Sequence, residues 1–148
     1  MKGSAQLPGT LRELFDSQKF AALATEYRGK PNNCLVAFAV TDDLRHLLFT
    51  TSRDTSKYRN IIAESRVAIL VDSRSNQDSD LLNAIAVTAT GEAKEATANE
   101  RDRLLGIYVA KHPQLADFAN SSENALVKVE IANYEISSFH NVRVFQPR

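Results

Sequence analysis

The segment Phe49–Ile61, with the sequence FTTSRDTSKYRNI, decides the fold because it joins a strand to a helix. Phe49 ends an apolar run, a hydroxyl-rich turn follows, and Tyr58 and Ile61 open the apolar face of the helix. Three basic residues lie where this helix begins: Arg53, Lys57 and Arg59. The N-terminus of a helix carries about half a positive charge, so each cation there costs about 0.3–1 kcal/mol. A bound anion would compensate for this cost.

The same segment is rich in hydroxyl groups, which belong to Thr50, Thr51, Ser52, Thr55 and Ser56. Free N–H groups, hydroxyl donors and a cation at the start of a helix suit a phosphate, and Lys57 supplies the counter-charge. Charge-assisted hydrogen bonds contribute about 1.5–3 kcal/mol each, which exceeds the cost of the cations. Alternatively, these residues are ordinary helix caps and solvated cations, which are nearly neutral in energy. The residues leave both interpretations open.

Length and composition indicate one globular domain over residues 1–148. Hydrophobic residues make up 43% of the chain and charged residues 24%, and the formal net charge is zero. A neutral chain excludes general electrostatic attraction to nucleic acid or to anionic membranes. The single cysteine, Cys34, excludes an intrachain disulfide, and no apolar run approaches the roughly 20 residues that span a bilayer. We therefore expect a soluble cytoplasmic protein without a nucleic-acid or membrane partner.

Apolar and alternating runs predict a mainly β or α+β chain. Strands are expected over residues 20–25, 34–41, 46–51, 66–72, 84–96 and 127–131, with further segments over 134–139 and 142–145. The β-branched run 66–72 predicts a strand buried on both faces, and residues 28–33 predict a turn. Capping boxes at 10–13 and 97–100 predict two helix starts. The sum is a small antiparallel barrel of six or seven strands with flanking helices.

The side chains of the common catalytic and metal sites are absent or scattered in this sequence. The glycines are too dispersed for a dinucleotide or P-loop motif, and no G-x-S-x-G elbow occurs. His46, His112 and His140 fall in separate segments without other ligands at metal-binding spacing, so no metal site is predicted. Cys34 has no base that the sequence pairs with it, and a strand cysteine is usually core. If the protein is an enzyme, a bound organic cofactor would supply its chemistry.

The order of these features resembles the pyridoxamine 5′-phosphate oxidase-like FMN-binding split-barrel family over roughly residues 10 to 140. That family has an N-terminal helix, a ring-binding strand, a strand ending in an aromatic residue and threonine, and a hydroxyl-rich turn with a phosphate-binding lysine. The matching segments are Phe20–Thr25, Cys34–Ala39, Phe49-Thr50 and Ser56-Lys57, followed by RVAILVD at 66–72 and a strand that ends at Gly91. The resemblance implies an antiparallel six- to seven-stranded split β-barrel with flanking helices.

The resemblance also implies an FMN site. Its cofactor-binding residues would be Cys34, Leu35, Val36, Ala37 and Phe38 along the ring, and Phe49, Thr50, Thr51, Ser52, Arg53, Ser56 and Lys57 around the phosphate. The ring would use backbone N–H and C=O groups, which do not depend on the side chains, so a plain barrel strand is the alternative for 34–38. Family members are homodimers with FMN at the interface. Phe139, His140 and Val142 would then close the partner's pocket, or else lie in the core or in solvent.

Departures from the family pattern bear on the reaction. The oxidases that act on vitamin B6 carry an arginine before the phosphate lysine, where this chain has Ser56. They also carry basic residues at both ends of the ring strand, where this chain has Cys34 and Ala39. We therefore expect an FMN-dependent oxidoreductase with another substrate. The alternatives are a non-catalytic flavin-binding or storage protein, the same barrel with a deazaflavin or haem, and a cofactor-free interaction domain.

Overall fold

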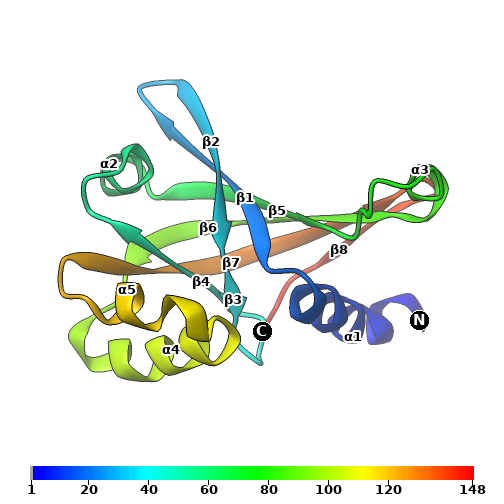
Figure 1. Cartoon of the computed structure of the whole chain (residues 1–148). Coiled ribbons are helices and arrows are strands. Elements are labelled where there is room, and N and C mark those ends of the chain that lie inside the picture. Colours follow the sequence, from blue (N-terminus) through cyan, green and yellow to red (C-terminus); the bar gives the residue numbers. More distant parts are fainter. Residues whose placement is uncertain (1) are drawn as a thin grey trace.

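A computed structural model describes residues 2–148, with side chains from Gln6 onward, as a curled antiparallel sheet flanked by helices (Figure 1). The helices are α1 (Lys2–Ser17), α2 (Ser56–Ala63), α3 (Asp80–Asn83), α4 (Ala98–Lys111), the 3-10 turn η1 (Pro113–Leu115) and α5 (Ala116–Asn120). The strands are β1 (Phe20–Tyr27), β2 (Lys30–Ala37), β3 (Ala39–Val40), β4 (His46–Ser52), β5 (Arg66–Asp72), β6 (Ile85–Glu95), β7 (Asn124–Ser138) and β8 (Val142–Phe145). The predicted split barrel with flanking helices is confirmed.

The order of the strands explains where the barrel closes and where it splits. The order in the sheet is β2-β1-β5-β6-β7-β4-β3, and β8 pairs with β7. β2 and β3 therefore lie at opposite ends of the sheet, although only Phe38 separates them in the chain. Phe38 is fully buried, and its N–H donates to the carbonyl of Lys19 (3.2 Å). The barrel closes at Phe38, and beyond it β2 and β4 diverge (Figure 1).

This closure corrects the prediction of one continuous strand over residues 34–41. The segment breaks at Phe38 because its two halves pair with different neighbours, β2 with β1 and β3 with β4. The predicted turn at 28–33 is also too long. Only Arg28 and Gly29, with φ of 51° and 78°, connect β1 to β2, and this is the two-residue turn with positive φ that hairpins favour.

The long pairing of β6 with β7 ties the two halves of the barrel together, because β7 also pairs with β4 and β8. The predicted segments 127–131 and 134–139 belong to this one strand. The register shifts between Thr90 and Gly91. A Cβ atom on Gly91 would lie 2.1 Å from the carbonyl oxygen of Glu130. The bulge therefore requires glycine at this position.

The prediction that residues 66–72 form a strand buried on both faces is wrong for the outer face of the sheet. The inward side chains of β5 are buried, but the outward Leu70 is 38% exposed. Leu35 and Leu70 lie on the same face because both pair with Ala22, and Phe20 shares it. Leu35 is 69% exposed and Phe20 is 60% exposed. We call this set (Phe20, Leu35 and Leu70) the outer apolar face.

The two predicted capping boxes have different outcomes. α1 begins at Lys2 instead of Thr10, and the Thr10 hydroxyl donates to the carbonyl of Gln6 (3.1 Å) in the preceding turn. The second box is confirmed, because the N–H of Thr97 donates to Oε2 of Glu100 (2.8 Å) at the start of α4.

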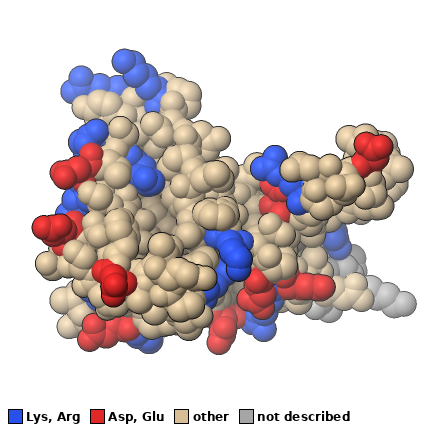
Figure 2. Space-filling model, in the orientation of Figure 1, with Lys and Arg blue, Asp and Glu red and all other residues tan. Residues whose placement is uncertain are grey.

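Charge is mixed over the surface. Figure 2 shows Lys and Arg interspersed with Asp and Glu over the face that it draws, and a narrow arm that projects from the body. Figure 1 places α3 at the tip of this arm. Within residues 2–148, no helix has both the length and the apolar character that crossing a bilayer requires.

Candidate functional site

The turn after β4 and the first turn of α2 form the predicted phosphate site. Thr55 is the N-cap of α2, with an extended backbone, and its hydroxyl accepts a hydrogen bond from the N–H of Tyr58 (3.3 Å). The N–H groups of Ser56 and Lys57 precede the helical ladder and find no acceptor among the described residues. These are the donors that a helix N-terminus presents to an anion.

Several predicted phosphate ligands form hydrogen bonds within the turn. The Oγ1 of Thr51 lies 2.8 Å from the Oγ1 of Thr55 and 3.0 Å from the carbonyl oxygen of Ser52. Thr51 is 3% exposed, so its hydroxyl faces the interior of the turn. The Ser52 hydroxyl accepts from the N–H of Asp54 (3.2 Å). Phe49, also named in the prediction, is fully buried in the core.

Arg53 belongs to a hydrogen-bond network that is centred on Glu95. Its Nη2 donates to Oε2 of Glu95 (2.6 Å) and its Nη1 to the carbonyl of Ser122 (2.8 Å). The hydroxyl of Tyr58 donates to Oε1 of the same Glu95 (2.7 Å). The hydrogen bond with Arg53 is the main reason that the pKa of Glu95 is lowered. Glu95 at the end of β6 thus fixes both the turn and the first turn of α2.

Lys57 is the half-buried cation of the site. Its ammonium group forms no hydrogen bond or ion pair with any residue from 6 to 148. Burial raises the pKa of the half-buried Cys34 thiol, and the nearby charge of Lys57 opposes this effect. The charge of the predicted phosphate lysine therefore acts on Cys34 of the predicted ring strand.

β2 has a free backbone edge in this region. It is the end strand of the sheet and pairs only with β1 among the described strands. Antiparallel strands direct alternate residues toward the neighbour, and the Phe38 N–H faces β1. By this alternation the backbone groups of Val36 and Cys34 also face β1, whereas those of Leu35 and Ala37 face the free edge. Leu35 and Ala37 are therefore the residues whose backbone could bind a ring.

Tyr108 of α4 is a residue of the site that the sequence did not reveal as such. It is 1% exposed, and its hydroxyl donates to the carbonyl of Ala37 (3.1 Å) while accepting from the Thr50 hydroxyl (3.3 Å). Tyr108 thus bridges β2 and β4, which do not pair with each other. Burial raises its pKa. Its place on the apolar face of a helix was the only sequence signal, and that signal indicates a core residue.

The predicted partner-facing residues lie far from this turn within one chain. Phe139 and Val142 are 68% and 60% exposed, and His140 is exposed beside them. Figure 1 places the β7–β8 connection near α3, at the opposite end of the molecule from α2. Only a second chain could bring these residues to the site.

The histidines and carboxylates form no metal site in the part of the chain that the structure describes. Nε2 of the buried His112 lies 2.7 Å from the carbonyl oxygen of Phe38. His112 therefore contacts the point at which the barrel closes.

A curled antiparallel barrel that opens between β2 and β4, with a helix N-terminus at the opening, defines a split-barrel protein. The sequence model of the pyridoxamine 5′-phosphate oxidase family matches residues 7–137. The chain therefore belongs to this family.

One relative and two solved structures are similar to this chain. A 5a,11a-dehydrotetracycline/5a,11a-dehydrooxytetracycline reductase of Streptomyces rimosus subsp. rimosus is 31% identical over 101 residues, which cover 64% of this chain and 70% of the reductase. A heme binding protein from Mycobacterium smegmatis superposes with a TM-score of 0.83 at 14% identity. The match covers 95% of this chain but 57% of that protein. A FAD-binding protein from Mesorhizobium loti superposes with a TM-score of 0.68 at 14% identity, over 84% of this chain and 89% of that one. Identities this low show the fold alone.

Proposed function

We propose that the chain binds FMN in the split between β2 and β4, with the phosphate at the start of α2. The observation that carries the proposal is Lys57, a half-buried cation without a partner among the described residues, beside a strand whose backbone edge is free. A phosphate would accept hydrogen bonds from the N–H groups of Ser56 and Lys57 and neutralise the ammonium group. Membership of the family supports the same cofactor.

The predicted residues would divide this work. Ser56 and Lys57 would contact the phosphate directly, and Thr50 would border it at the end of β4. Thr51, Ser52 and Thr55 would keep the shape of the turn, and Arg53 would anchor the turn to Glu95. The backbone of Leu35 and Ala37, within the predicted segment 34–38, would face the ring.

The protein would act as a homodimer with FMN at the interface. The outer apolar face supports this proposal, because three large apolar side chains on neighbouring strands are open to solvent in one chain. The exposed residues of the β7–β8 connection would then reach the site of the partner. A small molecule of unknown identity would be the redox substrate, and the protein would work in the cytoplasm.

The reaction would be FMN-dependent oxidoreduction. FMN supplies the redox chemistry of such proteins when it is bound. The residues of the chain would hold the cofactor by its phosphate and present backbone N–H groups to the ring. The buried Tyr108 hydroxyl at the split is already hydrogen-bonded to Ala37 and Thr50, and the part that we assign to the chain is binding and orientation. The likeness to a reductase supports an enzyme.

A purified sample tests the proposal directly. The protein should show the absorbance bands of an oxidised flavin and release FMN on heating, and the bound flavin should be reduced by NADH or NADPH or by another donor of a panel. Flavin without turnover would indicate a storage protein. A Soret band would favour haem, for which the heme binding structural relative is the supporting observation. A deazaflavin spectrum, or no binding of any of these cofactors, would refute FMN as the ligand.

A further inference from the structure

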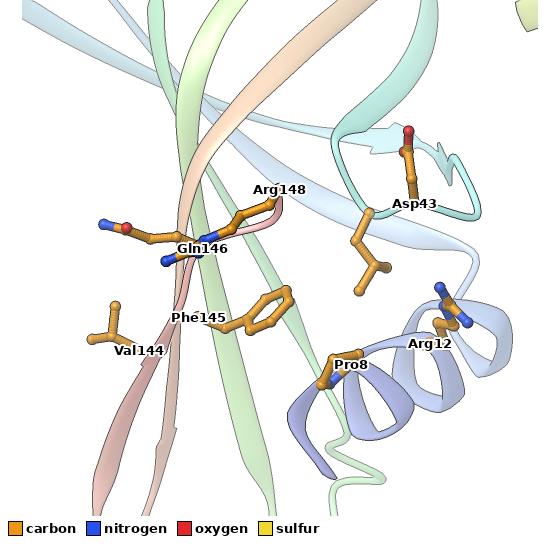
Figure 3. Close-up of a pocket in the computed structure, with 8 residues that line it drawn as sticks. Pro8, Arg12, Asp43, Val144, Phe145, Gln146 and Arg148 are labelled. Carbon is orange, nitrogen blue, oxygen red and sulfur yellow. The ribbon is translucent and has the colours of Figure 1, made fainter. Parts of the chain in front are cut away.

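A second cleft lies away from the split, between α1, the turn that joins β3 to β4, and the residues in and after β8 (Figure 3). Its volume of about 750 Å³ is in the range of small-molecule sites. The residues that line it are Pro8, Arg12, Asp43, Leu44, Val144, Phe145, Gln146 and Arg148. None of them belongs to the predicted cofactor site, so the cleft is an independent feature.

The apolar wall of this cleft is held firmly in place. The ring of Phe145 stacks on that of Tyr134, with 6.4 Å between the ring centroids. Tyr134 is fully buried, and its hydroxyl donates to the carbonyl of Leu44 (2.7 Å), which ties the β3–β4 turn to the wall. Pro8 of α1 faces Phe145 across the cleft (Figure 3). Two rigid rings that face each other favour a flat apolar ligand.

The charged groups of the cleft are mainly cationic. Arg12 and Arg148 form no ion pair with any described residue, and Nη2 of Arg12 donates to the carbonyl of Asp42. Asp43 is satisfied within its own turn, where its carboxylate accepts from the Thr41 hydroxyl (2.6 Å) and the N–H of Arg45 (3.0 Å). Figure 3 shows this carboxylate pointing away from Phe145 and Pro8. Two guanidinium groups therefore lie at the cleft, beside one carboxylate that is held within its own turn.

A third arginine, Arg143, lies two residues before Phe145 and therefore on the same face of β8. Its Nε is buried and has no hydrogen-bond partner within the described part of the chain. Arg143 is not among the residues that line the cleft, so the proposal does not use it.

We propose that this cleft binds a flat aromatic carboxylate. The aromatic body lies between Phe145 and Pro8, and the carboxylate pairs with Arg148. A guanidinium fork matches the two oxygens of a carboxylate, and such charge-assisted pairs are about twice as strong as neutral hydrogen bonds. The proposal does not depend on the cofactor, because the cleft and the split share no residue.

Calorimetric titration with 1-naphthoate tests the proposal, with and without saturating FMN. The neutral alcohol 1-naphthalenemethanol is the matched ligand. We expect 1-naphthoate to bind in both cases, and the alcohol to bind about tenfold more weakly. Arg148→Gln should weaken naphthoate binding about tenfold. Arg103→Gln, which removes an exposed arginine of α4 that forms no ion pair with residues 6–148, should leave it unchanged.

The location is tested by amide chemical-shift changes in the full chain. Changes centred on Leu44, Val144 and Gln146 support the cleft. The proposal is overturned if no binding is detected at millimolar naphthoate, if the alcohol binds equally well, or if Arg103→Gln weakens binding as much as Arg148→Gln. It is also overturned if the changes follow the free edge of β2 or if FMN competes with naphthoate, since both would place the ligand in the split. FMN binding itself is measured separately, so either proposal can fail alone.

Discussion

At the scale of single residues, the three cations at the start of α2 differ in what compensates their charge. Arg53 is paired with Glu95, and Arg59 donates to the carbonyl of Asp54 (2.6 Å) at its own turn. Lys57 has no such acceptor among the described residues. For the two arginines, acceptors within the protein therefore offset the electrostatic cost of a cation at a helix N-terminus. For Lys57, the proposed phosphate would compensate the charge.

Lys57→Gln should lower the affinity for FMN at least tenfold, because a charge-assisted hydrogen bond contributes about 1.5–3 kcal/mol. Titration of flavin fluorescence measures the affinity, and urea unfolding of the apoprotein should be unchanged. Lys94→Gln removes the same charge from an exposed position of β6 and is the matched control. An unchanged affinity in Lys57→Gln would show that the phosphate lies elsewhere.

Glu100 links the capping box of α4 to β7, and its removal should destabilise the fold in a pH-dependent manner. Its hydrogen bonds with Lys128 (2.7 Å) and with the N–H of Thr97 lower its pKa to about 2. A lowered pKa gives stability that is complete above the unfolded value of 4.5 and is lost as the pH falls toward 2. Glu100→Gln should therefore cost about 1 kcal/mol at neutral pH.

Urea unfolding of both proteins at neutral pH and at acidic pH values between these two pKa values measures this loss. The difference between wild type and Glu100→Gln should shrink as the pH falls. A difference that stays constant with pH would mean that the carboxylate charge contributes nothing and that only the shape of the side chain matters.

At the scale of elements, the predictions from sequence are correct for features that depend only on residues close together in the chain. The alternation in β7, the second capping box and the apolar runs of β4 and β6 are local signals, and the structure confirms them. The break at Phe38 arises because two halves of one run pair with different strands, which no local pattern records. Tyr108 and Ala37 are 71 positions apart, so their bond could not be read from spacing. Thr10 fits a capping box, but the helix already includes it.

The bulge in β6 gives a prediction at this scale. Gly91→Ala should destabilise the protein by about 1–3 kcal/mol, because the new Cβ would lie 2.1 Å from the carbonyl oxygen of Glu130 and the backbone must shift. Gly106→Ala in α4 is the matched control: no atom lies within 4 Å of its Cβ position, and alanine favours a helix by about 0.5–1 kcal/mol. The two variants should therefore change the urea midpoint in opposite directions. A neutral Gly91→Ala would contradict the need for glycine at the bulge.

At the scale of the whole molecule, one chain leaves three features incomplete. The outer apolar face is open to solvent, and the β7–β8 connection projects away from the body with Phe139 exposed. The predicted cofactor site also lies along a strand edge that no other described strand covers. A second copy of the chain that covers the outer apolar face would complete all three, which is why assembly and cofactor binding should be linked.

Leu35→Glu tests this link because Leu35 belongs both to the outer apolar face, through its side chain, and to the free edge, through its backbone. A charge at a side chain that is 69% exposed in one chain should not unfold the monomer, but it should prevent burial against a partner. We expect the wild type to sediment as a dimer and Leu35→Glu as a folded monomer with weaker FMN binding. Ile62→Glu, at a side chain 64% exposed on α2, should remain dimeric. A dimeric Leu35→Glu would exclude this face, whereas a monomer that keeps full FMN affinity would show that each chain holds its cofactor alone.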